Sequence, residues 1–315
     1  MQIVIDTDAG VDDAVALMLA LAHPTAHLHA ITTVTGNIGV DQVIRNVMDT
    51  LAVMKRDDVP VFRGAALPLV APWQHETVNV HGVDGFGDWA ARPNSRRQPE
   101  PEHAVLTLLR LADRFPGELT LIALGPLTNI ALAVRLDPAF PSKIRQLIWM
   151  GGAIYGYGNT DPFTAEFNIH IDPEAAYIVL NAFPESTMIA WEIAMKHEWL
   201  WADFDLLAAL KAAPAAKAFR GITAHWRKIG GQIPTVRGFV MPDPLAMAAA
   251  LYPEIVRESA FHHVAVELNG THTRGSTPVD FPRLSGKAPN VHIVMEVDQA
   301  AFYDLYRTLL TKGTL

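Results

Sequence analysis

Asp6-Thr7-Asp8-Ala9-Gly10-Val11-Asp12-Asp13 places four carboxylates within eight residues, directly after the apolar run Ile3-Val4-Ile5. The apolar run is typical of a short buried strand, and residues 11–21 have the composition of a helix packed in a core. A buried strand that turns into a helix is the repeating unit of α/β folds with a parallel sheet. Ligands bind at the carboxyl ends of the strands in such sheets, so the acidic turn lies where a site is expected.

The rest of the chain continues this alternation. We expect further strands at residues 29–34, 119–123, 147–150, 264–266 and 291–294. We expect further helices at residues 40–54, 127–135, 173–181 and 299–310, and helices also within residues 201–229. The sequence therefore predicts an α/β fold in which a single domain, residues 1–315, has a mostly parallel central sheet flanked by helices, related to the Rossmann fold.

The composition is that of a folded, mildly acidic protein. Half of the 315 residues are hydrophobic and 18% are charged, which suits a large core. The net charge of -8 and the lack of a Lys/Arg cluster disfavour nucleic acid polymers and anionic membranes as partners. The absence of cysteine excludes disulfides, thiol nucleophiles and thiolate zinc sites. The chain starts without a signal-peptide pattern, so we expect a cytoplasmic protein.

The acidic turn has two interpretations. Asp12 and Asp13 suit the start of a helix, and Asp8 suits an Asx turn, without any ligand. Four adjacent carboxylates repel one another, however, and their number favours a bound cation or a catalytic site. All of them are hard oxygen donors without His or Cys, which indicates calcium or magnesium and not zinc. We interpret Asp6 as a structural hydrogen-bond acceptor.

From this turn onward the chain resembles the inosine–uridine preferring nucleoside hydrolases. Their Asp-Thr-Asp-Pro-Gly-x-Asp-Asp run matches the acidic turn, with Ala9 where Pro is usual. Six further segments resemble the family in the same order: Thr33-Val34-Thr35-Gly36-Asn37, His81-Gly82-Val83-Asp84-Gly85, Leu124-Gly125-Pro126-Leu127-Thr128-Asn129, Met150-Gly151-Gly152, Glu166-Phe167-Asn168-Ile169 with Asp172-Pro173-Glu174-Ala175-Ala176, and Asp243-Pro244-Leu245-Ala246. Each segment alone is weak, and their shared order over residues 3–250 carries the resemblance.

The resemblance implies an enzyme of nucleoside salvage that hydrolyses the N-glycosidic bond of ribonucleosides to ribose and free base. A calcium-bound water would be activated by Asp8, and Asp8, Asp13, Asp243 and the Leu124 carbonyl would hold the ion. The implied substrate contacts are Asp12, Asn37, Glu166 and Asn168 on the ribose hydroxyls, Asn159 on the 5′ hydroxyl, Met150 and Phe167 nearby, and His81, His225 and Trp226 at the base. Members of the family are commonly dimers or tetramers, so we expect a homodimer or homotetramer.

The chain departs from the family beside the base. Many members carry His before the late metal-binding Asp, where Pro242 stands here, so His81, His225 or Trp226 would have to assist the leaving base. His225 and Trp226 suit a pocket or a surface equally well. Two other functions stay open: a nucleoside- or ribose-binding protein with little turnover, and a magnesium-dependent phosphatase using the Asp-x-Asp pair. The preference for purine or pyrimidine nucleosides also stays open.

Overall fold

A mixed sheet of eight strands forms the centre of the computed structural model, which describes residues 1–74, 77–161 and 163–315. Its strand order is β3-β2-β1-β4-β5-β6-β10-β9, and every neighbouring pair is parallel except β10 and β9. Its strands are β1 (Gln2–Thr7), β2 (His27–Thr33), β3 (Val61–Arg63), β4 (Leu119–Ala123), β5 (Ile144–Met150), β6 (Ser186–Ile189), β9 (Val256–His262) and β10 (Val291–Val297). A separate antiparallel pair joins β7 (Trp199–Leu200) and β8 (Gly238–Phe239).

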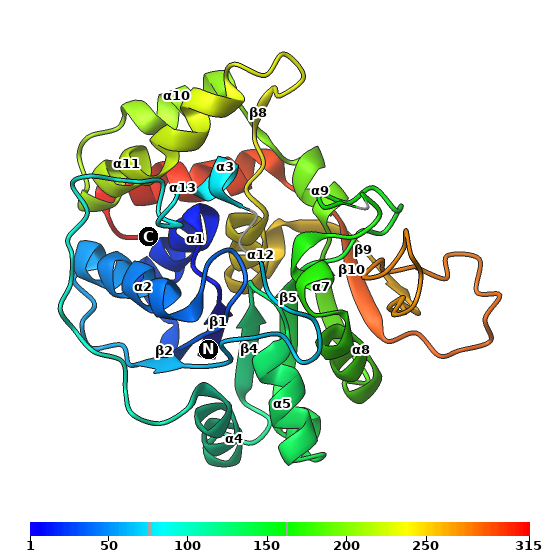
Figure 1. The fold of residues 1–315 in the computed structure, drawn as a ribbon. Coiled ribbons are helices and arrows are strands. Elements are labelled where there is room, and N and C mark those ends of the chain that lie inside the picture. Colours follow the sequence, from blue (N-terminus) through cyan, green and yellow to red (C-terminus); the bar gives the residue numbers. More distant parts are fainter. Residues whose placement is uncertain (75–76, 162) are drawn as a thin grey trace.

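Helices flank the sheet, as Figure 1 shows. They are α1 (Val11–Ala22), α2 (Val40–Met54), α3 (Val78–His81), α4 (Ala104–Arg114), α5 (Thr128–Leu136), α6 (Phe140–Lys143), α7 (Phe167–Ile171), α8 (Pro173–Ala182), α9 (Trp191–Lys196), α10 (Trp201–Ala209), α11 (Pro214–Gly230), α12 (Pro242–Leu251) and α13 (Gln299–Lys312), with a 3₁₀ turn at Pro253–Ile255. One group packs α1 against α2 and α12, and another packs α5 against α4 and α8. Within the described part of the chain, no helix has the length and apolar character needed to cross a bilayer.

The expected α/β class is confirmed, and its physical basis is the burial of the parallel strands on both faces. Ile3, Val4 and Ile5 of β1 are completely buried, as are Leu121 and Ile122 of β4. Because helices cover both faces of such strands, they read as continuous apolar runs, which is why they were visible in the sequence. The strand order reverses between β1 and β4, and this switch point lies beside the acidic turn.

The strand expected at residues 264–266 is wrong. Val264 makes only an isolated bridge to Val279, and the strand that pairs with β10 is β9, earlier in the chain. β9 is the edge of the sheet, and its exposed residues Arg257, Glu258 and Ser259 give it no apolar pattern. Polar residues on an edge strand prevent pairing with another chain, and they also conceal the strand from a reading based on hydrophobicity.

Candidate active site at the switch point of the sheet

The site is assembled from segments that follow neighbouring parallel strands. The acidic turn leaves β1 and enters α1, Asn37 follows β2, and Leu124 follows β4. Glu166 lies at the start of α7, after β5, and Asp243 lies in the first turn of α12. Because parallel strands end at the same edge of the sheet, residues far apart in sequence meet there.

Asp8 is completely buried and only half satisfied. Its Oδ2 accepts the backbone N–H of Asn37 at 2.7 Å. Its Oδ1 is buried and has no hydrogen-bond donor among the described residues. Gly36 and Gly125 pack directly on the carboxylate, and a Cβ at Gly125 would lie 2.8 Å from Oδ1. An unsatisfied carboxylate oxygen in such a place is costly unless a ligand or a proton completes it.

Three further acids surround Asp8. Asp12, Asp13 and Asp243 are buried, and one oxygen from each lies within 4.8 Å of the others. Asp13 is held by the Thr7 hydroxyl, by the Gly10 N–H at 2.9 Å and by the Asn37 amide at 3.3 Å. The Oδ1 atom of Asp12 has no donor within the described parts of the chain.

The electrostatics of these acids favour a cation. Burial raises the pKa of Asp12 to about 7, and the neighbouring Asp13 charge adds to this. Burial, and secondly the charge of Asp13, also raise the pKa of Asp8 and of Asp243 well above the usual range. A divalent ion among these oxygens would offset both the lost hydration and the mutual repulsion. The residues present therefore fit a metal centre with oxygen ligands.

Two further contacts concern the expected metal ligands. Asp12, expected at the ribose, lies with Asp13 and Asp243 in the cluster of three carboxylates, and Asp8 borders this cluster. The Leu124 carbonyl accepts the Asn168 side-chain amide at 2.7 Å. A carbonyl oxygen has a second lone pair, so this bond leaves Leu124 able to face a ligand as well.

Glu166, Asn168 and Asn159, which were also expected at the ribose, form a second cluster next to the acids. Glu166 is buried, and its carboxylate accepts the N–H groups of Asn168 at 3.0 Å and Gly152 at 2.9 Å. Burial raises the pKa of Glu166 to about 7. The Asn168 amide also donates to the Met150 carbonyl at 3.2 Å, so Met150 belongs to this cluster. Asn159 Oδ1 accepts the Phe167 N–H at 2.9 Å, which ties Asn159 to the start of α7.

The three residues expected at the base lie in different surroundings. His81 is buried beside the acids, where its Nδ1 accepts the Val11 N–H at 3.0 Å and lies 3.8 Å from Asp12 Oδ1. His225 Nε2 lies 3.1 Å from the Val78 carbonyl of α3. Trp226 packs in an aromatic cluster, with its ring 6.0 Å from that of Phe239. Of the three, the structure brings His81 directly to the acidic turn.

Two residues that support the site, Glu192 and Thr277, could not be predicted from the sequence. Glu192 accepts the N–H groups of Ile154 at 2.9 Å, Tyr155 at 2.8 Å and Tyr157 at 3.2 Å, and so braces the segment between Met150 and Asn159. Thr277 donates to the Ala153 carbonyl and accepts its N–H. Neither Glu192 nor Thr277 lies in one of the segments that resemble the family.

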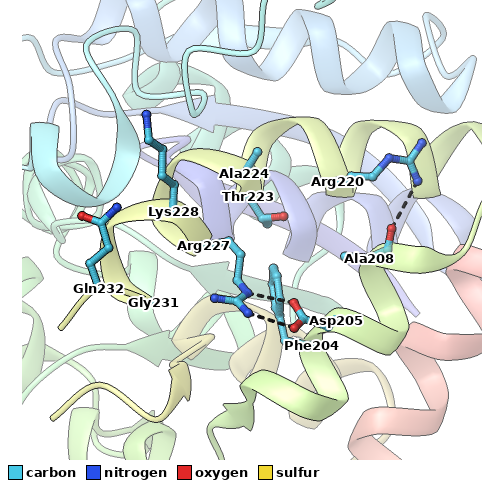
Figure 2. A pocket seen from close by; sticks show the side chains of 10 residues that line it. All are labelled: Phe204, Asp205, Ala208, Arg220, Thr223, Ala224, Arg227, Lys228, Gly231 and Gln232. Carbon is cyan, nitrogen blue, oxygen red and sulfur yellow. Dashed lines mark hydrogen bonds and ion pairs between the residues drawn. The ribbon is translucent and has the colours of Figure 1, made fainter. Parts of the chain in front are cut away.

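A cavity of about 420 Å³ between α10 and α11 lies apart from the carboxylates. Arg227 in its wall is paired with Asp205 by two hydrogen bonds, at 2.8 and 2.9 Å. Figure 2 shows Lys228 and Arg220 pointing away from this pair. Because its charged groups are paired or divergent, this cavity is a poorer candidate for the site than the buried acids.

Comparisons with known proteins identify the family of the chain. The family model described as inosine-uridine preferring nucleoside hydrolase matches residues 3–304. Together, the parallel sheet and the acids at its switch point define an α/β enzyme of the nucleoside hydrolase class. The chain belongs to the inosine-uridine preferring nucleoside hydrolase family.

Individual relatives extend over nearly the whole chain. The pyrimidine-specific ribonucleoside hydrolase RihA of Salmonella schwarzengrund is 35% identical over 97% of this chain and 96% of its own. RihA of Enterobacter sp. (strain 638) is 34% identical over 100% and 99%. Among solved structures, the plant nucleoside hydrolase PpNRh1 superposes with a TM-score of 0.91 at 30% identity, covering 99% of both chains. An inosine-guanosine nucleoside hydrolase superposes with a TM-score of 0.90 at 33% identity, covering 98% of both.

Proposed function

We propose that this chain hydrolyses the N-glycosidic bond of ribonucleosides with a calcium ion held by Asp8, Asp13, Asp243 and the Leu124 carbonyl. One observation carries the proposal. Asp8 and Asp12 each have a buried carboxylate oxygen without a hydrogen-bond donor among the described residues, and both lie beside further buried acids. Calcium suits such a set because its ligands are carboxylate and carbonyl oxygens. When bound, the ion would lower the pKa of a water and orient ribose hydroxyls.

Asp8 is proposed as the general base. Its Oδ1 is buried beside the other acids and has no competing donor among the described residues, so it is able to accept a proton. It would take the proton of the attacking water. Cleavage builds positive charge on the ribose, and the carboxylates around the sugar favour that charge in the transition state.

The ribose is proposed to lie between the acids and α7. Asp12, Asn37, Glu166 and Asn168 would bind its 2′ and 3′ hydroxyls, and Asn159 its 5′ hydroxyl. Glu166 and Asn168 are already fixed by hydrogen bonds to backbone groups, so they would meet the sugar without reorganisation. Such preorganisation favours a substrate that carries every hydroxyl.

Departure of the base is proposed to depend on His81. Pro242 occupies the first turn of α12 and has no proton to donate. His81 Nδ1 accepts the Val11 N–H, so the neutral imidazole carries its proton on Nε2 and can act as a donor there. His225 and Trp226 are proposed as further contacts around the base, and Met150 and Phe167 as further substrate contacts.

Removal of the 2′ hydroxyl is expected to lower kcat/KM by about 10⁴-fold, because buried hydrogen-bonding groups would be left unpaired. The test follows release of free base by chromatography from uridine, cytidine, inosine and adenosine and from their 2′-deoxy forms. Pyrimidine and purine nucleosides are both included, since the relatives named above include enzymes described for each class. Equal turnover of ribo- and deoxynucleosides would contradict the proposed ribose site.

Two further assays separate hydrolysis from the two other functions that the sequence left open, nucleoside binding without turnover and phosphate release. A binding protein would retain ribonucleosides tightly in equilibrium dialysis without releasing base. A phosphatase would release phosphate from p-nitrophenyl phosphate in the presence of magnesium. We expect base release from ribonucleosides and no phosphate release.

Gly36→Ala is expected to displace Asp8 and to weaken both calcium binding and turnover. A Cβ at Gly36 would overlap the Asp8 carboxylate, which is enclosed by backbone and cannot withdraw freely. Isothermal titration with calcium and a thermal melt measure the effect. Gly39→Ala is the matched control, because there a Cβ makes only ordinary contact with Trp73, 3.7 Å away. Equal calcium affinity in the two variants would refute this packing argument.

A further inference from the structure

We propose that Asn46 and Arg92 are positioning residues for base departure, because they hold the segment that follows His81 against the turn that carries Asp8. Neither residue lies in one of the sequence segments that resemble the family. The inference rests on the proposed function of His81. It concerns a buried polar network that joins the acidic turn to the loop after His81.

Asn46 connects two loops of the site through one side-chain amide. It lies on α2 and is completely buried. Its Nδ2 donates to the Ala9 carbonyl at 3.0 Å and to the Asp84 carbonyl at 3.1 Å. Ala9 directly follows Asp8, and Asp84 lies three residues after His81. Both protons of a single amide thus fix the distance between the acidic turn and residues 81–88, which we call the histidine loop.

Arg92 holds Asn46 and the histidine loop together. Its Nη2 donates to Asn46 Oδ1 at 2.8 Å, and its Nη1 donates to Asp84 Oδ2 at 2.8 Å. Its Nε donates to Asp49 on α2 at 2.5 Å, and its guanidinium lies 4.7 Å from the centre of the Phe86 ring. The side chain is 12% exposed, so these bonds form largely out of water. A planar fork satisfies all of them at once, which a lysine cannot do.

The histidine loop transmits this hold to His81. Asp84 Oδ1 accepts the N–H groups of Phe86 at 2.7 Å and Asp88 at 3.0 Å, which closes the loop on itself. Gly87 donates its N–H to the His81 carbonyl at 2.8 Å. Displacement of Asp84 would therefore move the backbone of His81 and, with it, the imidazole.

The acidic turn also depends on Asn46, through the hydrogen bond to Ala9. Ala9 has a φ of 28°, a conformation that costs free energy for a residue with a Cβ and that Pro cannot adopt. Its N–H donates to the Thr7 hydroxyl at 3.1 Å, and its carbonyl accepts from Asn46. With Ala in place of the family's usual Pro, this turn depends on hydrogen bonds for its shape. Asn46 supplies one of them.

The test is a double-mutant cycle between Arg92→Lys and His81→Ala. Each single variant is expected to lower kcat on uridine or inosine, whichever the wild type prefers, because a misplaced group can cost about 100-fold. Neither is expected to slow an activated p-nitrophenyl riboside comparably, since that leaving group needs little protonation. Arg92→Lys breaks the bonds to Asp84 and to Asn46 Oδ1 but leaves the Asn46 Nδ2 bond to Ala9, so its effect passes through His81. In the His81→Ala background it should therefore cause no further loss.

Two more variants guard the result. Asp84→Asn keeps an oxygen for the Phe86 and Asp88 N–H groups but loses the charged partner of Arg92, and it should reproduce Arg92→Lys even if the latter folds poorly. Arg63→Ala is the control, since it removes an exposed ion pair between β3 and Asp41 of α2, the helix that carries Asn46, and should leave kcat unchanged.

The outcomes separate this inference from the proposed function. Losses that multiply in the double variant, equal losses on both substrates, or an unchanged rate in His81→Ala would each overturn the inference while nucleoside hydrolysis stands. A wild-type protein that releases no base from any nucleoside would instead overturn the proposed function.

Discussion

Replacing Asp8 by asparagine is expected to lower kcat for every ribonucleoside by about 10²–10⁴-fold while the fold is retained. An asparagine oxygen can still accept the Asn37 N–H that Asp8 Oδ2 accepts at 2.7 Å. Its amide nitrogen, however, cannot accept a proton from water and contributes no charge to an ion. Circular dichroism and a thermal melt check the fold, and release of free base measures the rate.

The matched control is Asp6→Asn, two residues earlier in the same buried segment. Asp6 Oδ1 accepts the Thr32 hydroxyl at 2.5 Å and the Asn129 amide at 2.8 Å, and an asparagine oxygen can replace it. Burial raises the pKa of Asp6 to about 7, so a neutral side chain is better tolerated here than at an exposed aspartate. We expect near-normal kcat in this variant. Near-normal turnover in Asp8→Asn would refute its role as base.

Removal of divalent cations with EGTA is expected to abolish base release and to lower the melting temperature, and calcium should restore both. Without an ion, the acids at the switch point are buried next to one another with oxygens that lack donors among the described residues. An ion that binds only the folded chain stabilises it by about 2.7 kcal/mol at a concentration 100 times its Kd. Calorimetry and base release, before and after dialysis, measure the two effects.

Variants identify where the ion binds. Asp243→Asn removes one buried acid and should lose the calcium-dependent rise in melting temperature, whereas the exposed Asp41→Asn should keep it. Magnesium and zinc are added in parallel arms to establish the identity of the ion. Full turnover by protein shown by elemental analysis to be free of metal would exclude the proposed calcium centre and leave the family assignment intact.

The sequence was most informative where burial was complete. The strands at Ile3 and Leu121 and the helix at residues 40–54 were visible because apolar runs and helical periods reflect burial directly. β6 and β9 were missed for two different reasons. β6 has four residues, and β9 carries exposed polar side chains at the edge of the sheet.

The site, like the fold, could be predicted from the sequence only in part. Clustered acids and ordered motifs indicated its position, because charge crowding is a local property of the chain. Contacts between distant segments left no such signal: Asn46 donating to Ala9, Thr277 to Ala153, and His225 approaching Val78 all depend on packing. Trp226 was ambiguous because an aromatic on a helix serves a core and a pocket alike, and its neighbour Phe239 is recognisable only in three dimensions.

Asp8 and Asp243 lie 235 residues apart in the chain, yet they meet in one cluster. A nascent polypeptide cannot assemble this cluster until α12 has been synthesised and has packed against α1. Ion uptake at the proposed centre would accordingly require the chain through Asp243, and a product truncated before α12 would retain the acids of the opening turn without this partner.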